Sequence, residues 1–463
     1  MSPRPIAFPT LKTTDNEFAE AVATLKALLR FDTTNPPGNE GPAAEFLARK
    51  FRDAGLTPEL AGAEPRRPNL VCKLPADPSR KCGRPLVLSC HLDVVPADPA
   101  RWTHPPFDAV EADGCVWGRG AIDMKGFATL AAMTVLAIRR RGLPLNRDLI
   151  FVAVADEEAG AELGSQWLVE NRPDLLGNDP EYIVNEVGGF TLPLDGKRFY
   201  PVQVAEKGVA WLRLTVRGTP GHSSLPSEDN ALGQLGEAMA RIARARLPWH
   251  VSEPARDFLG GIARESGPLK RLFSPLLLHP LTGPALLDRA IADPARRASV
   301  EAVLRNTANP TVARGGSKIN VLPGSASVDI DGRLAPGQTA ADLVRELRAV
   351  LGDPTGGRFD FEVLRESEAV AFPPDTPFFE AIRAAVKRHD PEGIVVPAIV
   401  PGFTDSKNYA RLGAVCYGFY PLQLPEDLNF AALFHGDDER IPLDGFRWGL
   451  ETLLDLVVDF AGA

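Results

Sequence analysis

The sequence predicts an α/β fold in which a domain with a mostly parallel sheet is interrupted by a smaller α+β domain. Short apolar runs bounded by Pro and Gly alternate with helical patterns over residues 1–206, which is typical of a parallel sheet. Residues 207–365 instead follow a β-α-β-β-α-β order with alternating strands, which favours an antiparallel, ferredoxin-like sheet. The first pattern returns over 366–463. We therefore expect a discontinuous first domain with the second domain inserted in it.

The N-terminal part of the predicted first domain begins with two helices. Residues 17–30 are apolar at a helical period, and Pro42 stands in the first turn of the next helix. The elements that follow are expected, in order, as strands at 70–74 and 86–90, a helix at 122–141, a strand at 149–155, a helix near 162–171 and a strand at 182–184.

The inserted part and the C-terminal part complete the prediction. In the insert we expect a strand at 211–218, a helix at 230–245, a helical stretch at 254–305, a hairpin over 319–334 that turns at Pro323–Gly324, a helix at 339–351 and a strand at 359–364. After it we expect a helix at 377–389, a strand near 394–398, a helix near 406–412, a strand at 414–419 and a helix at 444–460.

Composition and charge exclude several classes of partner. The 463 residues carry a net charge of −9, which is unfavourable for binding nucleic acid or an anionic membrane. The longest apolar stretch, Phe127–Ile138, is shorter than the roughly 20 residues of a membrane span. The N-terminus has no apolar signal region, and the five cysteines form no CxxC pair. We therefore expect a cytoplasmic protein that binds neither nucleic acid nor membrane.

Residues that can bind metal follow three of the predicted strands directly. His91 and Asp93 follow the strand at 86–90, Glu157 and Glu158 follow the strand at 149–155, and Glu186 follows the strand at 182–184. Because ligands bind beyond the carboxyl ends of parallel strands, we expect these side chains to converge on one crevice.

Asp123 is expected to reach the same crevice from a Gly-rich loop, GRGAIDMKG (118–126), that precedes a helix. Several carboxylates in one crevice would raise each other's pKa values, and divalent cations relieve that repulsion. Two Zn²⁺ ions would balance the charge of Asp123, Glu158, Glu186 and one hydroxide. Two such ions can activate a water and polarise a carbonyl or phosphoryl oxygen.

Five motifs follow one another along the chain: SCHLDVVP (89–96), GRGAIDMKG (118–126), Glu157–Glu158, GTPGHSS (218–224) and FHGDDERI (434–441). In this order they resemble the M20 family of metallopeptidases, which includes carboxypeptidases, aminoacylases, and acetylornithine and succinyl-diaminopimelate deacylases. The resemblance covers essentially the whole chain. It implies a zinc-peptidase catalytic domain interrupted by a domain that serves as a lid and as a dimerisation surface.

The resemblance also implies roles for the residues at the metal site. The ligands of two Zn²⁺ ions, for which Co²⁺ or Mn²⁺ could substitute, would be His91, Asp123, Glu158, Glu186 and His435. Asp123 would bridge the two ions. Asp93 would orient His91, as carboxylates commonly do for metal-binding histidines. Glu157 would be the general base that takes a proton from the bridging water and passes it to the leaving amine.

Further roles are implied for residues of the inserted domain and of a late loop. His222 resembles a histidine that crosses a homodimer to stabilise the oxyanion in the neighbouring site. Asn320 and Arg333 resemble lid residues that bind the substrate's carbonyl and carboxylate. Gly402 and Thr404 resemble a substrate-binding loop.

The expected activity is hydrolysis, by a metal-bound hydroxide and a Glu general base, of an amide bond next to a free carboxylate. The substrate would be a short peptide or an N-acyl amino acid, as in carboxypeptidase-like members. A deacylase of the acetylornithine or succinyl-diaminopimelate type is the alternative, and a non-catalytic binding protein on the same fold is a remote one.

Overall fold

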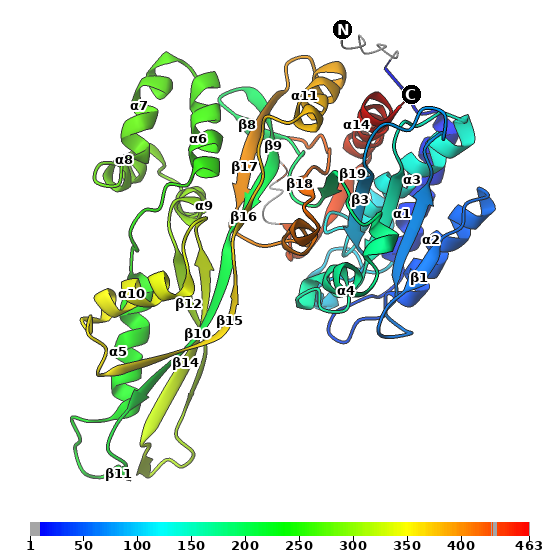
Figure 1. Cartoon of the computed structure of the whole chain (residues 1–463). Helices are drawn as coiled ribbons and strands as arrows, with labels where there is room; N and C mark the ends of the chain where they lie inside the picture. The colour runs from blue at the N-terminus through cyan, green and yellow to red at the C-terminus, as the bar shows by residue number, and fades with distance from the viewer. Residues whose placement is uncertain (1–9, 427, 429–432, 463) are drawn as a thin grey trace. The chain divides into compact units, whose positions relative to one another are not determined.

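A computed structural model describes residues 10–426, 428 and 433–462. The chain divides into two compact units (Figure 1). The first runs to Val204 and also includes Phe372–Pro397 and the chain from Thr404 onward. The second consists of Ala205–Ala371 and Ala398–Phe403. Each unit has a hydrophobic core of its own.

The first unit is built on a mixed sheet whose centre is parallel. β3 (Leu86–His91) pairs in parallel with β6 (Leu149–Val154) on one side and with β7 (Tyr182–Asn185) on the other. β18 (Val415–Gly418) pairs in parallel with β7. These four strands are apolar runs buried along nearly their whole length, as expected where helices cover both faces of a sheet. The predicted mostly parallel central sheet is confirmed.

Antiparallel strands extend this parallel centre on both sides, so the sheet order is β1-β2-β6-β3-β7-β18-β9-β16, with β8 and β17 also paired to β9. A separate three-stranded sheet has the order β19-β5-β4. The bounds of these further strands are β1 Glu59–Ala61, β2 Asn69–Leu74, β4 Val110–Ala112, β5 Cys115–Trp117, β8 Leu192–Leu194, β9 Lys197–Glu206, β16 Val370–Ala371, β17 Ile394–Val400 and β19 Arg440–Pro442.

The central helix of the first unit is α3 (Lys125–Arg141), in which every residue from Lys125 to Ile138 is buried. A helix that is apolar on all sides must be enclosed by its neighbours. It packs against α14 (Leu443–Ala461), although the two helices are far apart in the sequence (Figure 1). Among the described residues the other helices of this unit are α1 Asp15–Leu29, α2 Gly41–Asp53, α4 Ser165–Asn171, α11 Pro377–His389 and α12 Ser406–Tyr409, with short 3₁₀ turns at Pro99–Arg101, Glu157–Ala159, Pro173–Leu176 and Ala410–Leu412.

The second unit contains an antiparallel four-stranded sheet in the order β12-β14-β10-β15. Its core strands are β10 (Gly208–Arg217) and β14 (Ser325–Leu334), whose alternate residues are buried. The buried side chains pack against α5 (Ala231–Arg244) and α10 (Ala340–Leu351). The remaining elements are α6 Glu253–Glu265, α7 Pro268–Leu278, α8 Gly283–Ala290, α9 Pro294–Leu304, β11 Gly221–His222, β12 Thr307–Gly315, β13 Val321–Leu322 and β15 Phe359–Ser367.

The hairpin predicted over 319–334 is wrong. β13 pairs with β11, whereas β14 pairs with β10 and with β12 (Thr307–Gly315), a strand that the sequence pattern does not predict. β12 is an edge strand that is mostly exposed, contains Pro310 and has an irregular register after it. Such a strand lacks the alternating pattern by which strands are recognised, and Pro is tolerated at a sheet edge.

The chain enters and leaves the second unit at neighbouring positions. Ala205 and Glu206, the last residues of β9, pair antiparallel with Ala371 and Val370 of β16. The two ends of this 205–371 segment are therefore joined by strand pairing.

The helices that the structure describes include none with the length and apolar character needed to cross a membrane.

Glu20 provides a test of the electrostatic links between helices of the first unit. Its carboxylate accepts hydrogen bonds from Arg140 Nη1 on α3 at 2.6 Å and from Lys50 Nζ on α2 at 2.9 Å. The bond from Arg140 is the main reason why the pKa of Glu20 is lowered to about 2. A lowered carboxyl pKa stabilises the fold above the unfolded pKa of about 4.3, and this stabilisation is lost as the pH falls toward 2.

We expect Glu20→Gln to lower the free energy of unfolding by about 0.5–1 kcal/mol at pH 7, a value typical of partly exposed ion pairs. The difference from the wild type should shrink as the pH falls from 5 toward 2. Denaturant titrations of both proteins across this range measure it. A difference that stays constant down to pH 2 would contradict the ionic origin of the stabilisation.

Candidate metal centre

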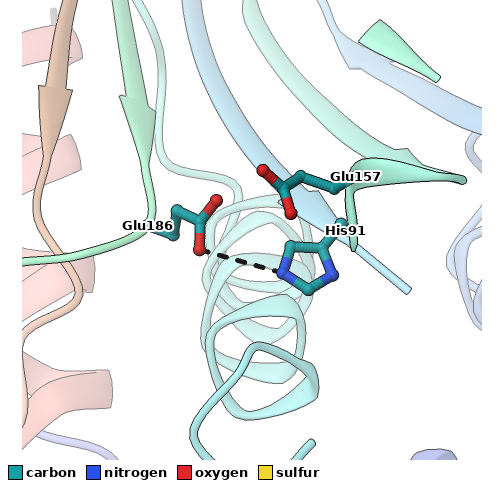
Figure 2. Close-up of side chains that lie close together, drawn as sticks. All are labelled: His91, Glu157 and Glu186. Carbon is teal, nitrogen blue, oxygen red and sulfur yellow. Dashed lines mark ion pairs between the residues drawn. The ribbon is translucent and has the colours of Figure 1, made fainter. Parts of the chain in front are cut away.

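Side chains from the ends of three parallel strands lie close together beyond the carboxyl ends of these strands. β3 ends at His91, the turn after β6 carries Glu157 and Glu158, and Glu186 follows β7. Figure 2 shows the side chains of His91, Glu157 and Glu186 directed toward one another from their separate segments. Convergence of these residues, expected from the strand pattern, is what the structure shows.

Asp123 lies between two groups of ligand-type side chains. Its Oδ1 is 3.0 Å from His91 Nε2, and its Oδ2 is 3.2 Å from His435 Nε2. On the first side, Glu186 Oε2 lies 3.8 Å from His91 Nε2. On the second side, Glu158 Oε2 lies 3.2 Å from His435 Nε2. The five predicted ligands thus form two groups of three that share one carboxylate.

Glu157 lies against the first of these groups. One ligand-type atom from each of His91, Glu157 and Glu186 lies within 4.8 Å of the other two. His91, Asp123 and Glu158 satisfy the same condition. Proximity alone therefore allows Glu157 either to bind a metal or to face a water held by one.

Burial and mutual repulsion oppose ionisation of the acids at this centre. Burial and the nearby Glu186 raise the pKa of Glu157 well above its ordinary value. Burial also raises the pKa of Glu186 to about 7, and burial together with Asp123 raises the pKa of Glu158. Glu158 Oε1 is buried and has no hydrogen-bond partner among the described residues. These observations fit a site for divalent cations, because cations compensate clustered carboxylates.

The two histidines favour the ionised form of Asp123. The pKa of Asp123 is lowered because hydrogen bonds from His435 and His91 outweigh the effect of burial. The pKa of His435 is raised to about 10, mainly by its contact with Asp123 and then by Glu158. This set of imidazole nitrogens and carboxylate oxygens is one that Zn²⁺ binds well and that also accommodates Co²⁺ or Mn²⁺.

Asp93 connects the segments that carry these residues. Its carboxylate accepts the backbone N–H groups of Glu157 at 3.2 Å and of Glu158 at 3.0 Å, and its Oδ1 lies 3.5 Å from His91 Nδ1. The side chain of Asn35 donates to Asp93 at 2.8 Å. The closer partner of His91 Nδ1 is the backbone C=O of Asp93 at 2.9 Å, while the Asp93 carboxylate holds the turn of the two glutamates; its predicted role in orienting His91 stays a prediction. The role of Asn35 was not anticipated, because its TTNPPGNE segment indicates only a turn.

The predicted substrate-binding residues fall in both units. Thr404 belongs to the first unit, where its buried Oγ1 accepts from Asn185 at 3.4 Å. Gly402, His222, Asn320 and Arg333 belong to the second unit, and their predicted roles stay predictions.

The local settings of the second-unit residues differ. His222 is exposed on β11, where its Nδ1 lies 2.8 Å from Ser224 Oγ. Asn320 is exposed in the loop before β13. Arg333 of β14 donates to Asp331 through Nε at 2.9 Å and Nη2 at 3.2 Å, and its guanidinium lies 5.3 Å from the ring centre of Phe403. Arg333 is thus held in place by a carboxylate and an aromatic ring.

Histidines and buried carboxylates beyond the strand ends of a parallel sheet can bind divalent cations, and such ions activate water in metal-dependent hydrolases. The chain belongs to Peptidase family M20/M25/M40, whose sequence profile matches residues 87–459. The resemblance to the M20 family is confirmed, and the chain is an enzyme of the peptidase and amidohydrolase class.

Two curated relatives and one solved structure illustrate the similarity. N-fatty-acyl-amino acid synthase/hydrolase PM20D1 from Homo sapiens is 30% identical over 399 residues, covering 82% of this chain and 74% of PM20D1. Aminoacylase-1 from Sus scrofa is 26% identical over 442 residues, covering 94% of each chain. The M20 family metallo-carboxypeptidase Sso-CP2 from Sulfolobus solfataricus has the same fold, with a TM-score of 0.68, 16% identity, and coverage of 96% of this chain and 99% of that one.

Proposed function

We propose that the chain is a two-metal hydrolase that cleaves an amide bond next to a free carboxylate, in an N-acyl amino acid or a short peptide. The observation that carries this proposal is the position of Asp123, whose two oxygens face different histidines at 3.0 and 3.2 Å. A carboxylate that faces two ligand groups in this way suits a pair of cations about 3.5–4 Å apart.

In this proposal each ion has one ligand group. His91, Asp123 and Glu186 hold the first ion, and His435, Asp123 and Glu158 hold the second. Two Zn²⁺ ions bound here would polarise the amide carbonyl and lower the pKa of a water between them. Asp93 keeps His91 in a fixed orientation while its own carboxylate stays hydrogen-bonded to the Glu157–Glu158 backbone.

Glu157 is the proposed general base. Its carboxyl group is buried, and burial together with the nearby Glu186 raises its pKa, which is the direction that strengthens a base. It takes the proton of the attacking water on a carboxylate oxygen and then donates it to the leaving amine nitrogen. Asp93 supports this role by holding the Glu157 backbone N–H.

The substrate's free carboxylate is the proposed partner of Arg333, since a guanidinium can bind a carboxylate through two N–H groups. We expect Asn320, Gly402 and Thr404 to line the substrate, and His222 to act across a homodimer formed through the second unit. The names of the two relatives, an N-fatty-acyl-amino acid synthase/hydrolase and an aminoacylase, favour an N-acyl amino acid as the substrate class. A cytoplasmic location remains a prediction.

A metal measurement combined with a substrate screen tests the proposal. Chelator-treated protein reconstituted with Zn²⁺ should retain two equivalents per chain and hydrolyse N-acyl amino acids or dipeptides. The matching methyl esters should be poor substrates, because they lack the carboxylate. N-acetylornithine and N-succinyl-diaminopimelate in the same screen test the deacylase alternative. Fewer than one equivalent of zinc, or equal turnover of acids and methyl esters, would contradict the proposal.

A further inference from the structure

Glu439 is a fully buried acid whose side chain contacts the segment that carries Asp123. Its Oε1 accepts the backbone N–H groups of Ile122 at 2.7 Å and of Asp123 at 2.9 Å. Its Oε2 accepts the N–H of Gly120 at 2.9 Å and a hydrogen bond from Arg119 Nη1 at 2.8 Å. One carboxylate therefore holds four donors of the five-residue segment 119–123.

We propose that Glu439 is a positioning residue that sets the backbone of segment 119–123, so that the two oxygens of Asp123 face His91 and His435. The inference rests on the proposed two-metal function. Glu439 itself contacts neither histidine through any of its hydrogen bonds, so its effect on the metal centre passes through the Asp123 backbone.

The 119–123 segment depends on such an external acceptor because it lies outside the helices and strands. The N–H groups of Arg119 and Ala121 donate to the backbone of Pro106 and Gly118. Those of Gly120, Ile122 and Asp123 have Glu439 as their acceptor, and a buried N–H without an acceptor is unfavourable. Gly120 takes a left-handed φ of 89°, and a Cβ added there would lie 2.9 Å from the Val94 side chain. No helix or strand hydrogen bonding therefore stabilises the conformation of this segment.

Glu439 also joins the two segments that supply metal ligands. It follows His435 by four residues, and its backbone C=O accepts the N–H of Gly118 at 2.9 Å. Arg119 Nη2 donates to the backbone C=O of Gly436 at 2.8 Å. The buried Arg119–Glu439 ion pair therefore lies between the His435 loop and the Asp123 loop and fixes one to the other.

Glu439→Gln tests this inference with little change in side-chain volume. A glutamine amide has only one acceptor oxygen. Its NH₂ group must therefore face N–H donors whose hydrogen bonds the second carboxylate oxygen accepts in the wild type. We expect the affinity for Zn²⁺, measured by competition with a chromophoric chelator, to fall about 10- to 100-fold, as is usual when a residue supporting a metal ligand is changed. The visible absorption spectrum of the Co²⁺-substituted protein should also change, since it reports coordination geometry independently of activity.

Asp148→Asn is the matched control. Asp148 is also buried, accepts a backbone N–H from Ala76 at 2.9 Å and pairs with Lys73 at 2.6 Å. No contact of Asp148 that the structure records involves segment 119–123. This control should lose thermal stability yet keep the wild-type Zn²⁺ affinity and Co²⁺ spectrum.

The outcomes separate this inference from the proposed function. Wild-type Zn²⁺ affinity and an unchanged Co²⁺ spectrum in folded Glu439→Gln would overturn the positioning role while the two-metal function stands. Failure of the wild type to bind two ions would instead overturn the proposed function. If Glu439→Gln does not fold, Glu439→Asp keeps the charge, shortens the reach by one methylene and is judged by the same two measurements.

Discussion

Glu157→Gln should lower kcat by about 10²- to 10⁴-fold while the protein keeps two equivalents of bound metal. The loss is that of a general acid–base group, because glutamine cannot take up the proton of the attacking water. Glu157 contacts the ligand group of His91 and Glu186 without completing either of the two groups that share Asp123. Its removal should therefore affect the proton transfer and leave the metal ions in place.

Glu162→Gln is the control for this variant, because Glu162 lies five residues further along the chain and its side chain is exposed. It should have wild-type turnover. Metal content by atomic spectroscopy and kcat from initial rates are the two measurements. Loss of one metal equivalent in Glu157→Gln would make Glu157 a ligand, and near-normal turnover would exclude it as the base.

Asp123→Ala should abolish the binding of both ions rather than one. Each oxygen of Asp123 faces a different histidine, so the alanine removes one ligand from each group at once. Loss of the ions removes several kcal/mol of transition-state stabilisation, which corresponds to a rate decrease on the order of 10³-fold or more. Isothermal titration with Zn²⁺ and initial rates on an N-acyl amino acid measure the two effects.

Glu158→Gln provides the contrast, because Glu158 lies 3.2 Å from His435 and is assigned to the second ion only in the proposed arrangement. It should weaken one of the two binding events and leave the other close to the wild-type value. The thermal stabilisation that saturating Zn²⁺ gives to the wild type should be absent in Asp123→Ala and partial in Glu158→Gln, because only ligand that binds the folded state raises its stability. Two unchanged binding events in Asp123→Ala would contradict a shared ligand.

Strands that are buried along their whole length could be predicted from the sequence. β3 and β6 are continuous apolar runs between Pro- or Gly-rich turns, and both were predicted. β9 (Lys197–Glu206) was not, because it is antiparallel, carries Pro201 and begins with two basic residues. The 319–334 segment looked like a hairpin because Pro323–Gly324 separates two apolar runs. Its short first run pairs with β11 instead. This pairing depends on a segment about 100 residues earlier in the sequence and not on the local pattern.

The same distinction applies to the metal centre. His91, Glu157 and Glu186 could be expected together because each follows a buried strand of one parallel sheet. Glu439 lies within the FHGDDERI motif, yet nothing in that motif indicates what it binds. Its partners are backbone N–H groups 316–319 residues away, and backbone groups carry no sequence signature. Asn35 escaped prediction for a similar reason, since its contact with Asp93 forms only after folding.

The strand pairing at the two ends of the 205–371 segment has a consequence for how the protein is made. β7 leaves the ribosome more than 200 residues before its parallel neighbour β18. If the second unit folds during this interval, pairing of Ala205 with Ala371 closes the intervening loop in advance. For a flexible loop of that length, closure costs about 4–5 kcal/mol in chain entropy. Folding of the second unit thus lowers the entropic cost of adding β18 to the parallel sheet. We expect the metal ligands to assemble only after translation has passed His435.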